Sequence, residues 1–354
     1  MRTWWSRPVA VASTLASTLA LLALAPQQAY AESGPGADLV SYAKAADSHC
    51  VTVVRRGKTV LSKDLDKSVA TSQGFSVTKS VTSLLVGIAQ DRGKLDLDDR
   101  VATYVPQWRG TASSKITIRH LLANTSGREW SLTTDYQKMV LAADKTGFSI
   151  KLSQQAAPGA EWIYNNSAIQ VLDRVIEKAV GKPTADYAEQ VLFGPLKMKH
   201  TAMGRDAAGN TMTFAGVAST CDDLAKLGVM LADGGKNRAV RHGKRIVSKS
   251  YLTWATQRPS SALNAAYGLL FWINEPGPML PAVPLAAGTP IPQGPMVPAA
   301  SDDSFWALGL YNQVLYVSPS TRVVAVRMGD APSAAAGWTL GGFTERALQV
   351  AAAG

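Results

Sequence analysis

The sequence has few cysteines, few histidines and only one long apolar segment, and each shortage argues against a class of function. Two Cys and four His occur among 354 residues, and none has neighbours at the spacing of a zinc site. After residue 31 there is no run of 18 uncharged apolar residues. We therefore expect no metal cofactor, and no stable membrane span in the mature chain.

Several motifs are also missing. There is no Gly-rich phosphate-binding loop, so phosphoryl transfer is not indicated. There is no Gly-x-Ser-x-Gly, the strained turn that presents the nucleophile in one large class of hydrolases. Lysine and arginine are scattered, and no nucleic-acid-binding motif accompanies them. We expect no nucleic-acid partner.

The first thirty residues differ from the rest. Arg2 and Arg7 precede an apolar run over residues 9–25, and Ala29-Tyr30-Ala31 then forms a small-x-small cleavage site. This pattern predicts a signal peptide over residues 1–31, cleaved after Ala31, and a secreted or periplasmic protein. A retained anchor is the alternative, but the run is short for a span of roughly 20 residues.

The mature chain would be basic. Removing Arg2 and Arg7 leaves 34 Lys and Arg against 26 Asp and Glu, a formal charge of +8 on residues 32–354. This excess favours anionic partners such as acidic cell-envelope polymers. In an oxidising compartment Cys50 and Cys221 are able to form a disulfide, but sequence separation does not decide whether they meet.

Strand patterns lie at both ends of the chain, and helical spacing dominates the middle. At the N-terminal end, residues 38–48 have helical spacing and precede a hairpin over 51–60 with an Arg-Gly-Lys turn. At the C-terminal end, β-branched runs over 313–317 and 322–328 precede a helix over 342–352. The clearest helical stretches between them are 77–90, 118–123, 167–180, 185–192 and 221–231.

These patterns predict a single α+β domain over residues 32–354. Both chain ends would form one antiparallel sheet flanked by terminal helices, with a helical insertion at about 80–255 and a cleft between the two parts. A Pro-rich segment at about 275–304 is too long to be a core element. Both a loop overhanging the cleft and a surface excursion without fixed structure remain open.

The strongest local signal is Ser76-Val-Thr-Lys79 at the first turn of an amphipathic helix. A spacing of three places the Ser76 hydroxyl and the Lys79 amine on one helix face. Serine needs a nearby base to become a nucleophile, and lysine serves only if burial and the positive helix end lower its pKa. Alone, the motif is weak because it occurs by chance.

Further motifs follow in a specific order. Tyr164-Asn-Asn166 lies 88 residues after Ser76 and leads into a helix. The chain resembles the serine β-lactamase and penicillin-binding-protein superfamily over residues 37–350. Further sequence motifs that support this resemblance lie at 93–99, 120–127, 192–198 and 216–225. It is most similar to the branch with class C β-lactamases, D,D-carboxypeptidases, related esterases and 6-aminohexanoate-dimer hydrolases.

The resemblance implies catalytic roles for Ser76, Lys79 and Tyr164. The Tyr164 hydroxyl would lie beside the other two and relay the proton to the leaving group, and Asn166 would bind the substrate amide or the lysine. A tyrosine that shuttles this proton needs Lys⁺ to stabilise its phenolate, so the three should titrate together. The alternative reading makes Tyr164 a core aromatic and Asn166 a helix N-cap.

The third motif of the superfamily departs from the pattern. Where a Lys or His would begin a Lys-Thr-Gly triplet, this chain has Ala307-Leu308-Gly309. Ala307 cannot bind a substrate carboxylate. Gly309 still permits a close approach of the strand, and the N–H groups of Leu310 and Ser76 would form the oxyanion hole.

Two weaker features remain. Residues 267–273, Trp306 and the Pro-rich segment would line an apolar acyl pocket, or their aromatics would be core residues. Arg128-Glu129 would contact the substrate or form a solvated charge pair.

We therefore predict an exported serine hydrolase that works without metal or organic cofactor on a small-molecule ester, amide or peptide. Short acyl esters and 6-aminohexanoate-type oligomers rank ahead of penicillins. The alternatives are a D,D-carboxypeptidase or β-lactamase acting on cell-wall peptides or β-lactams, and a non-catalytic binding module with this fold.

Overall fold

The computed structural model describes residues 34–237 and 243–354, so the predicted signal peptide lies outside the described residues. The helices are α1 (Pro35–Ala45), α2 (Val77–Asp91), α3 (Ile118–Leu122), α4 (Met139–Leu141), α5 (Lys145–Lys151), α6 (Asn166–Val180), α7 (Thr184–Ala188), α8 (Cys221–Ala232), α9 (Lys249–Thr256) and α10 (Leu340–Ala353). Across the described ranges, none of them is long and apolar enough to cross a membrane.

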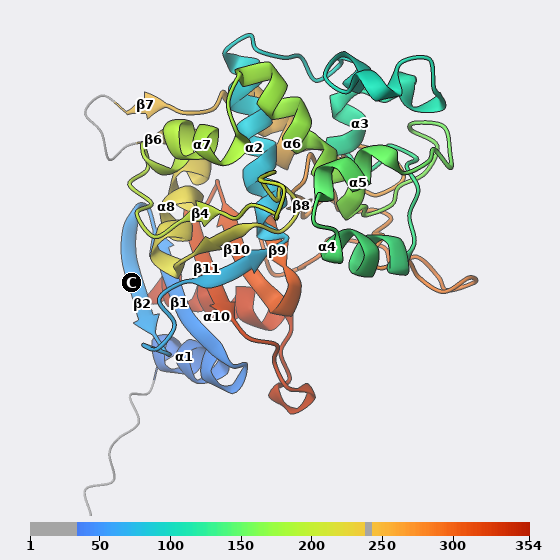
Figure 1. The fold of residues 1–354 in the computed structure, drawn as a ribbon. Helices are drawn as coiled ribbons and strands as arrows, with labels where there is room; N and C mark the ends of the chain where they lie inside the picture. The colour runs from blue at the N-terminus through green and yellow to red at the C-terminus, as the bar shows by residue number, and fades with distance from the viewer. Residues whose placement is uncertain (1–33, 238–242) are drawn as a thin grey trace, which may run out of the picture. The chain divides into compact units, whose positions relative to one another are not determined.

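The strands form three sheets. They are β1 (Ser48–Arg55), β2 (Lys58–Asp64), β3 (Ser72–Phe75), β4 (Ala202–Met203), β5 (Val217–Ser219), β6 (Lys236–Asn237), β7 (Lys244–Arg245), β8 (Trp272–Ile273), β9 (Phe305–Gly309), β10 (Gln313–Ser318) and β11 (Val323–Gly329). The main sheet is antiparallel in the order β2-β1-β11-β10-β9-β8 (Figure 1).

Both chain ends meet in the main sheet, as predicted. β1 pairs with β11 from Ser48 opposite Gly329 to Arg55 opposite Val323. β1 and β2 form the predicted hairpin, whose turn residues Arg56 and Gly57 both have positive φ. The α+β architecture with a sheet built from both ends is therefore confirmed.

Helices cover both faces of this sheet. α1 and α10 pack together against β1 and β11 on one face, while α8 and α2 lie on the other (Figure 1). Every residue of β11 is consequently buried, which explains why its sequence is apolar apart from Arg327. α8 approaches closely at Gly228, where an added Cβ would lie 2.4 Å from Val324.

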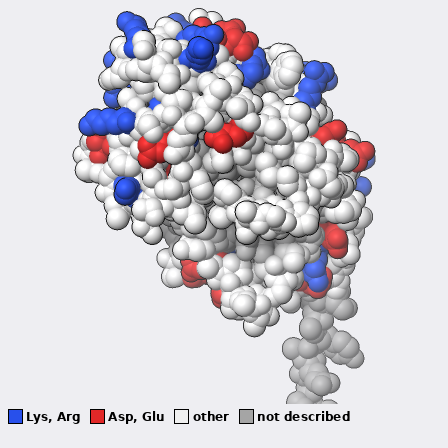
Figure 2. All heavy atoms as spheres, turned by 90° about the vertical axis from the view of Figure 1, so that its right-hand side faces the viewer, with Lys and Arg blue, Asp and Glu red and all other residues white. Residues whose placement is uncertain are grey.

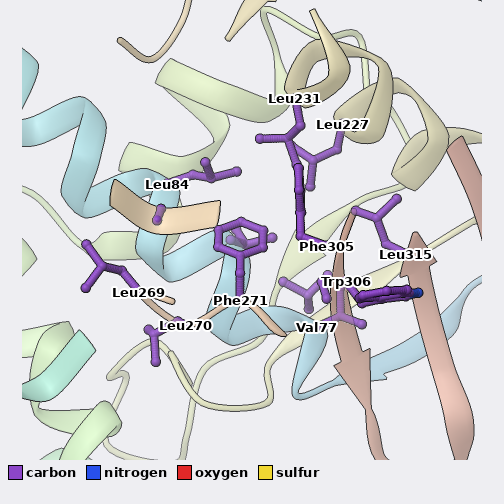
Figure 3. Close-up of a cluster of buried hydrophobic side chains, with 14 of the residues drawn as sticks. Val77, Leu84, Leu227, Leu231, Leu269, Leu270, Phe271, Phe305, Trp306 and Leu315 are labelled. Atoms are coloured by element: carbon purple, nitrogen blue, oxygen red, sulfur yellow. The ribbon is translucent and has the colours of Figure 1, made fainter. Parts of the chain in front are cut away.

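α2 runs through the centre of the molecule. Its residues from Val77 to Ala89 are all buried, because it packs against the sheet as well as against α6 and α9. Figure 3 shows part of this core, where Val77 and Leu84 meet Leu227 and Leu231 of α8 and Phe305 of β9. The helix carrying the Ser-x-x-Lys motif is therefore held from several sides.

Two residues assigned to a pocket belong to this core instead. Phe271 packs edge-on against Phe305 with ring centres 5.6 Å apart. Trp306 points to the opposite face of β9, where its indole N–H donates to Thr344 of α10 at 3.4 Å. The core alternative holds for both, and the pocket prediction was wrong for them.

A small second sheet was not predicted. It has the order β3-β5-β4, with Ser72 opposite Ser219 and Ala202 opposite Ala218. Its strands are two to four residues long, so they carry no alternating pattern that sequence inspection detects. Its importance is positional, because β3 ends at Phe75, immediately before Ser76.

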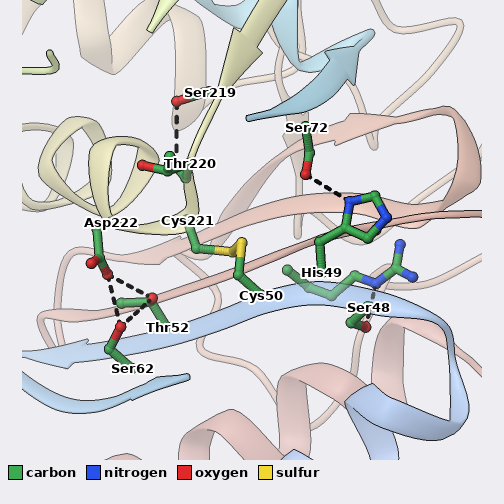
Figure 4. The surroundings of a disulfide bond; sticks show 12 residues. Ser48, His49, Cys50, Thr52, Ser62, Ser72, Ser219, Thr220, Cys221 and Asp222 are labelled. Carbon is green, nitrogen blue, oxygen red and sulfur yellow. Dashed lines mark hydrogen bonds between the residues drawn. A yellow bond between two sulfur atoms is a disulfide. The ribbon is translucent and has the colours of Figure 1, made fainter. Parts of the chain in front are cut away.

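Cys50 of β1 and Cys221, the first residue of α8, form a disulfide (Figure 4). Their Cα atoms are 6.0 Å apart, across a sequence separation of 171 residues. This answers the question that the sequence left open. Beside the bond, the Asp222 carboxylate accepts hydrogen bonds from the hydroxyls of Thr52 and Ser62, both at 2.9 Å.

The Pro-rich segment between β8 and β9 has no helix or strand, yet it is held by backbone hydrogen bonds. The N–H of Met279 donates to the carbonyl of Pro292 at 2.9 Å, and Gly294 donates to Gly277 at 3.1 Å. The side chain of Asn274 bonds both the N–H and the carbonyl of Val297. These bonds give the loop a fixed path, contrary to the idea of an unstructured excursion.

Candidate active site

Ser76 lies at the junction of β3 and α2. The residue before it, Phe75, has φ of 45°, a conformation that non-glycine residues rarely adopt. Ser76 is the N-cap of α2, but its side chain makes no capping hydrogen bond with the helix. Its Oγ instead accepts a hydrogen bond of 2.7 Å from Lys79 Nζ.

Lys79 is a buried amine without a carboxylate in hydrogen-bond contact. Its side chain is 1% exposed, and Nζ donates to Ser76 Oγ and, at 2.8 Å, to the carbonyl of Phe214. Burial lowers the pKa of Lys79 to about 7, and the charge of Asp135 opposes that shift. At neutral pH a large fraction of this amine is unprotonated and able to accept a proton.

Tyr164 completes the cluster. Its ring centre lies 4.8 Å from Lys79 Nζ. Burial raises the pKa of Tyr164, and a hydrogen bond with Ser76 opposes that shift. A phenolate is therefore disfavoured, in contrast to the expectation that Lys⁺ would stabilise one. The reason is that the same burial that protects the tyrosine proton also removes the lysine proton.

The ring of Tyr164 belongs to an aromatic group. It stacks on Trp272 with ring centres 6.0 Å apart, and Tyr267 meets it edge-on at 6.1 Å. Trp162 packs against Tyr267 at 5.3 Å. Tyr164 is thus a buried aromatic, as the alternative expected, while its role in proton relay stays a prediction.

The adjacent asparagines divide their roles differently from the sequence-based alternative. Asn165, not Asn166, is the N-cap of α6, since its side chain accepts from the N–H of Ala168 at 2.7 Å. Asn166 is the first helical residue and is 4% exposed. Its N–H donates to Asp135 at 2.8 Å and its side chain bonds Tyr136, so a substrate contact stays a prediction.

Asp135 is a buried member of the site that sequence analysis missed. It is 0% exposed and lies in a turn of π-helix over Thr134–Lys138. Its carboxylate accepts from the N–H groups of Asn166 and Ser167 and from the Ser167 hydroxyl, at 2.8, 2.7 and 2.6 Å. A carboxylate at the N-terminus of α6 is stabilised by the helix dipole.

The end of β9 lies against the segment that precedes Ser76. A Cβ added at Gly309 would lie 2.2 Å from the carbonyl oxygen of Gly74, so only glycine permits this approach. Tyr311 meets Phe75 edge-on at 5.3 Å. Leu310, between Gly309 and Tyr311, therefore lies near Ser76, while its role as an oxyanion donor stays a prediction. Ala307 is 1% exposed and supplies no cation.

Arg128 is not the solvated charge that was one of its two expected roles. It is 3% exposed, and its guanidinium lies 4.4 Å from the ring centre of Trp108. It donates to Ser113 Oγ and to the carbonyls of Ser149 and Ile150, at 2.7, 2.9 and 3.2 Å. Burial lowers the pKa of Arg128 to about 10, and the residue acts as a structural cation.

The Pro-rich loop borders the Tyr164 side of the site. Trp162, Ile163 and Tyr164 line a pocket of about 260 Å³ together with loop residues such as Leu280, Leu285 and Ile291. The interpretation of the loop as an overhang of the cleft is consistent with this position. Figure 2 shows the side of the molecule that carries α4, α5 and this loop, with scattered charges of both signs around a broad uncharged area.

In the described part of the chain, no group of three or more His, Cys, Asp or Glu is arranged to hold a metal ion. The arrangement that does exist is a hydroxyl held by a buried amine beside a buried phenol. It is suited to moving one proton between three adjacent atoms while the serine oxygen attacks an electrophile.

Comparison with known proteins agrees with this geometry. The family model described as Beta-lactamase matches residues 37–336. A β-lactamase of Pseudomonas fluorescens is 29% identical over 164 residues, covering 43% of this chain and 44% of that protein. Penicillin-binding protein 4* of Bacillus subtilis is 31% identical over 133 residues, covering 36% and 29%. The chain spans less than half the length of these curated relatives.

Solved structures share the fold at low sequence identity. A Bacillus anthracis protein provisionally named a 6-aminohexanoate-dimer hydrolase has a TM-score of 0.70 at 18% identity, covering 88% of this chain and 81% of its own. A family VIII carboxylesterase gives 0.65 at 14%, covering 91% and 98%. The D-alanine carboxypeptidase AmpC of Burkholderia cenocepacia gives 0.58 at 18%, covering 89% and 99%.

Proposed function

Because the chain belongs to the Beta-lactamase family, we propose that it is an exported serine hydrolase that forms an acyl-enzyme on Ser76 and cleaves an ester or amide bond. One observation carries the proposal: a buried Lys79 amine with a pKa of about 7 lies 2.7 Å from the Ser76 oxygen. A base whose pKa is near the working pH is the most effective proton acceptor.

Acylation proceeds in two steps. Neutral Lys79 accepts the Ser76 proton while Oγ forms a bond to the carbonyl carbon, and the carbonyl electron pair moves to oxygen. The N–H groups of Ser76 and Leu310 stabilise this oxyanion. The intermediate then collapses, the bond to the leaving atom breaks, and the Lys79 proton passes through the Tyr164 hydroxyl to that atom.

Deacylation repeats the sequence with water as the nucleophile. Water gives a proton through Tyr164 or directly to Lys79 as its oxygen adds to the acyl carbon. Collapse of the second intermediate breaks the bond to Ser76 Oγ, and the proton returns to that oxygen. The cycle releases an acid and an alcohol or amine, and restores the neutral amine.

The surroundings of the site favour neutral substrates. Ala307 supplies no cation for a carboxylate, and the pocket beside Tyr164 is lined by uncharged residues. The names of two structural neighbours, a carboxylesterase and a 6-aminohexanoate-dimer hydrolase, agree with ester and amide substrates. We therefore place short esters ahead of β-lactams. We also rank 6-aminohexanoate-type amides ahead of β-lactams, but on the neighbour's name alone, since their free carboxylate gains nothing from an uncharged pocket.

The direct test is hydrolysis of 4-nitrophenyl butyrate by residues 32–354, beside the Ser76→Ala variant. We expect turnover by the wild-type protein, loss of at least about 10²-fold in the variant, and a fluorophosphonate adduct only on the wild type. Equal activity in both proteins would disprove the role of Ser76. Absence of both turnover and adduct would favour a non-catalytic binding module.

A second candidate is β-lactam or D,D-peptide hydrolysis, which the names of the curated relatives favour. The buried Ala307 opposes it, since no cation replaces the one that grips a carboxylate. Turnover of a chromogenic cephalosporin faster than that of the butyrate ester would reverse our ranking.

Export is supported by the disulfide between Cys50 and Cys221, because such bonds persist in oxidising compartments. Intact mass of the protein recovered outside the cytoplasm should correspond to a chain that begins at Glu32. Association with anionic cell-envelope polymers, suggested by the +8 charge, should weaken as salt is raised.

A further inference from the structure

The pocket between Tyr164 and the Pro-rich loop has chemistry that the proposed reaction does not yet use. Its walls are Trp162, Ile163 and Tyr164 on one side and loop residues including Leu280, Leu285 and Ile291 on the other. None of its lining residues is charged. At about 260 Å³ it is smaller than the roughly 300–1,000 Å³ that encloses a drug-sized ligand. It fits a short chain or a single ring.

The loop side exposes apolar residues to solvent. Ile291 is 44% exposed although it lines the pocket, and Leu280 and Leu285 are only partly buried. Filling the pocket with an apolar group would remove this surface from water. The loop is held in place by the bonds from Met279 to Pro292 and from Gly294 to Gly277, so the wall exists before a ligand arrives.

Tyr164 connects this pocket to the chemistry. Its hydroxyl interacts with Ser76, and its side chain lines the pocket. In the proposed mechanism Tyr164 passes the proton to the leaving atom, which must therefore lie within about 3 Å of the phenol oxygen. The substituent on that atom then continues along Tyr164, while the acyl chain departs from the other side of the carbonyl carbon.

We propose that this pocket binds the leaving group of the substrate, and that the enzyme selects esters and amides whose alcohol or amine part is a short apolar chain. This inference rests on the proposed function and deepens it. Selectivity therefore depends on the alcohol or amine side of the scissile bond more than on the acyl side.

Two ester series separate the two sides. One series keeps acetate and lengthens the alcohol from ethanol to hexanol, and the other keeps ethanol and lengthens the acid from acetic to hexanoic, with acid release followed in a pH-stat. We expect kcat/KM to rise about threefold per added methylene in the alcohol series until the pocket is full. In the acid series we expect a total change below about threefold. A reversed result would overturn the assignment.

The loop offers a matched pair of variants. Ile291 and Val283 are both exposed aliphatic residues of the loop, at 44% and 50%, but only Ile291 lines the pocket. Ile291→Asp should lower the ratio of kcat/KM for hexyl acetate to kcat/KM for ethyl acetate at least about tenfold. Val283→Asp should leave this ratio and both activities unchanged. Equal effects of the two variants would contradict the assignment.

Ser76→Ala is the separate control, and the proposed function is wrong if this variant retains ester turnover. If the wild type forms the fluorophosphonate adduct but hydrolyses neither ester series, only the pocket assignment is wrong.

Discussion

Lys79 and Arg128 are two buried basic side chains whose pKa values respond differently to burial. Both are nearly inaccessible to solvent, and both are bonded by hydroxyl and carbonyl oxygens. Burial lowers the pKa of Lys79 to about 7 but that of Arg128 only to about 10. The same physical cause therefore brings the pKa of Lys79 near neutral pH and leaves Arg128 charged.

The difference follows from the chemistry of the two groups. An ammonium that loses its hydration gives up a proton near neutral pH, whereas a guanidinium spreads its charge and keeps it. Arg128 also donates to more acceptors and lies over the ring of Trp108, and these contacts stabilise its buried charge. Only Lys79 has a reactive oxygen, that of Ser76, within hydrogen-bond distance.

The largest expected effect tests whether Lys79 must lose its proton. Lys79→Arg and Lys79→Met should each reduce kcat/KM by about 10²–10⁴-fold, because neither side chain accepts a proton at pH 7. Steady-state hydrolysis of 4-nitrophenyl butyrate measures the loss. Activity within tenfold of wild type in Lys79→Arg would show that charge, rather than basicity, is what the site uses.

The second effect is opposite in sign at the two sites. The folded-state pKa of Lys79 lies below 10.5, so the unfolded chain binds more protons between pH 7 and 10.5, and stability falls as pH is lowered through that window. Lys79→Met should therefore raise the free energy of unfolding at pH 6 by about 2 kcal/mol, after loss of its hydrogen bonds. The gain should shrink as pH rises above 7 and become a loss before pH 10.5, where only the missing hydrogen bonds remain.

Arg128→Met is the counterpart and should destabilise the protein by about 2–4 kcal/mol. It leaves the buried carbonyls of Ser149 and Ile150 without their donor. Urea unfolding at pH 6 and pH 9 compares the two variants. If Lys79→Met were destabilising at pH 6, burial of the charged Lys79 amine would not reduce the free energy of unfolding as we assume.

A smaller effect on stability separates the contribution of the Arg128 charge from that of its planar guanidinium geometry. Arg128→Lys keeps the charge but loses the planar fork that reaches Ser113 and both carbonyls. We expect a loss of about 1–2 kcal/mol in unfolding free energy, with kcat/KM within twofold of wild type. Thermal unfolding and ester hydrolysis measure these quantities. A large catalytic defect in a folded variant would place Arg128 in the reaction after all.

The smallest effect is a displacement of the pH profile. The wild-type kcat/KM should rise with pH through about 7, because only the neutral amine of Lys79 accepts a proton. The charge of Asp135 raises the pKa of Lys79, so Asp135→Asn should move the rising limb to lower pH. Ser167→Ala is the control, since it removes one hydrogen bond to Asp135 but leaves its charge. A limb that moves equally in both variants would indicate a structural cause.

Much of the fold was predictable because it depends on local sequence patterns. The hairpin at Arg56-Gly57, the helix from Val77 and the strands at 313–317 and 322–328 rest on periodicity and turn residues that lie next to each other in the chain. Ser76 and Lys79 were recognisable because one helical turn brings them together.

The remainder depends on contacts between distant segments. Asp135 has no sequence signal, since its partners Asn166 and Ser167 lie 31 and 32 residues away. Phe214 binds the Lys79 amine through its main-chain oxygen, a contact that every residue type can make and that the sequence therefore does not reveal. The disulfide, the burial of Arg128 and the pocket under the Pro-rich loop are likewise set by tertiary packing.

The pairing of β1 with β11 also determines when this fold can first form. Arg55 meets Val323, which is made 268 residues later, so the main sheet cannot close until synthesis has reached β11. β10 and the end of β9 join that sheet beside β11, and Gly309 can only then settle against Gly74. Such long-range pairing is slow to form. A ribosome-bound or truncated chain that lacks β11 would carry an intact Ser76–Lys79 helix and still have no finished site.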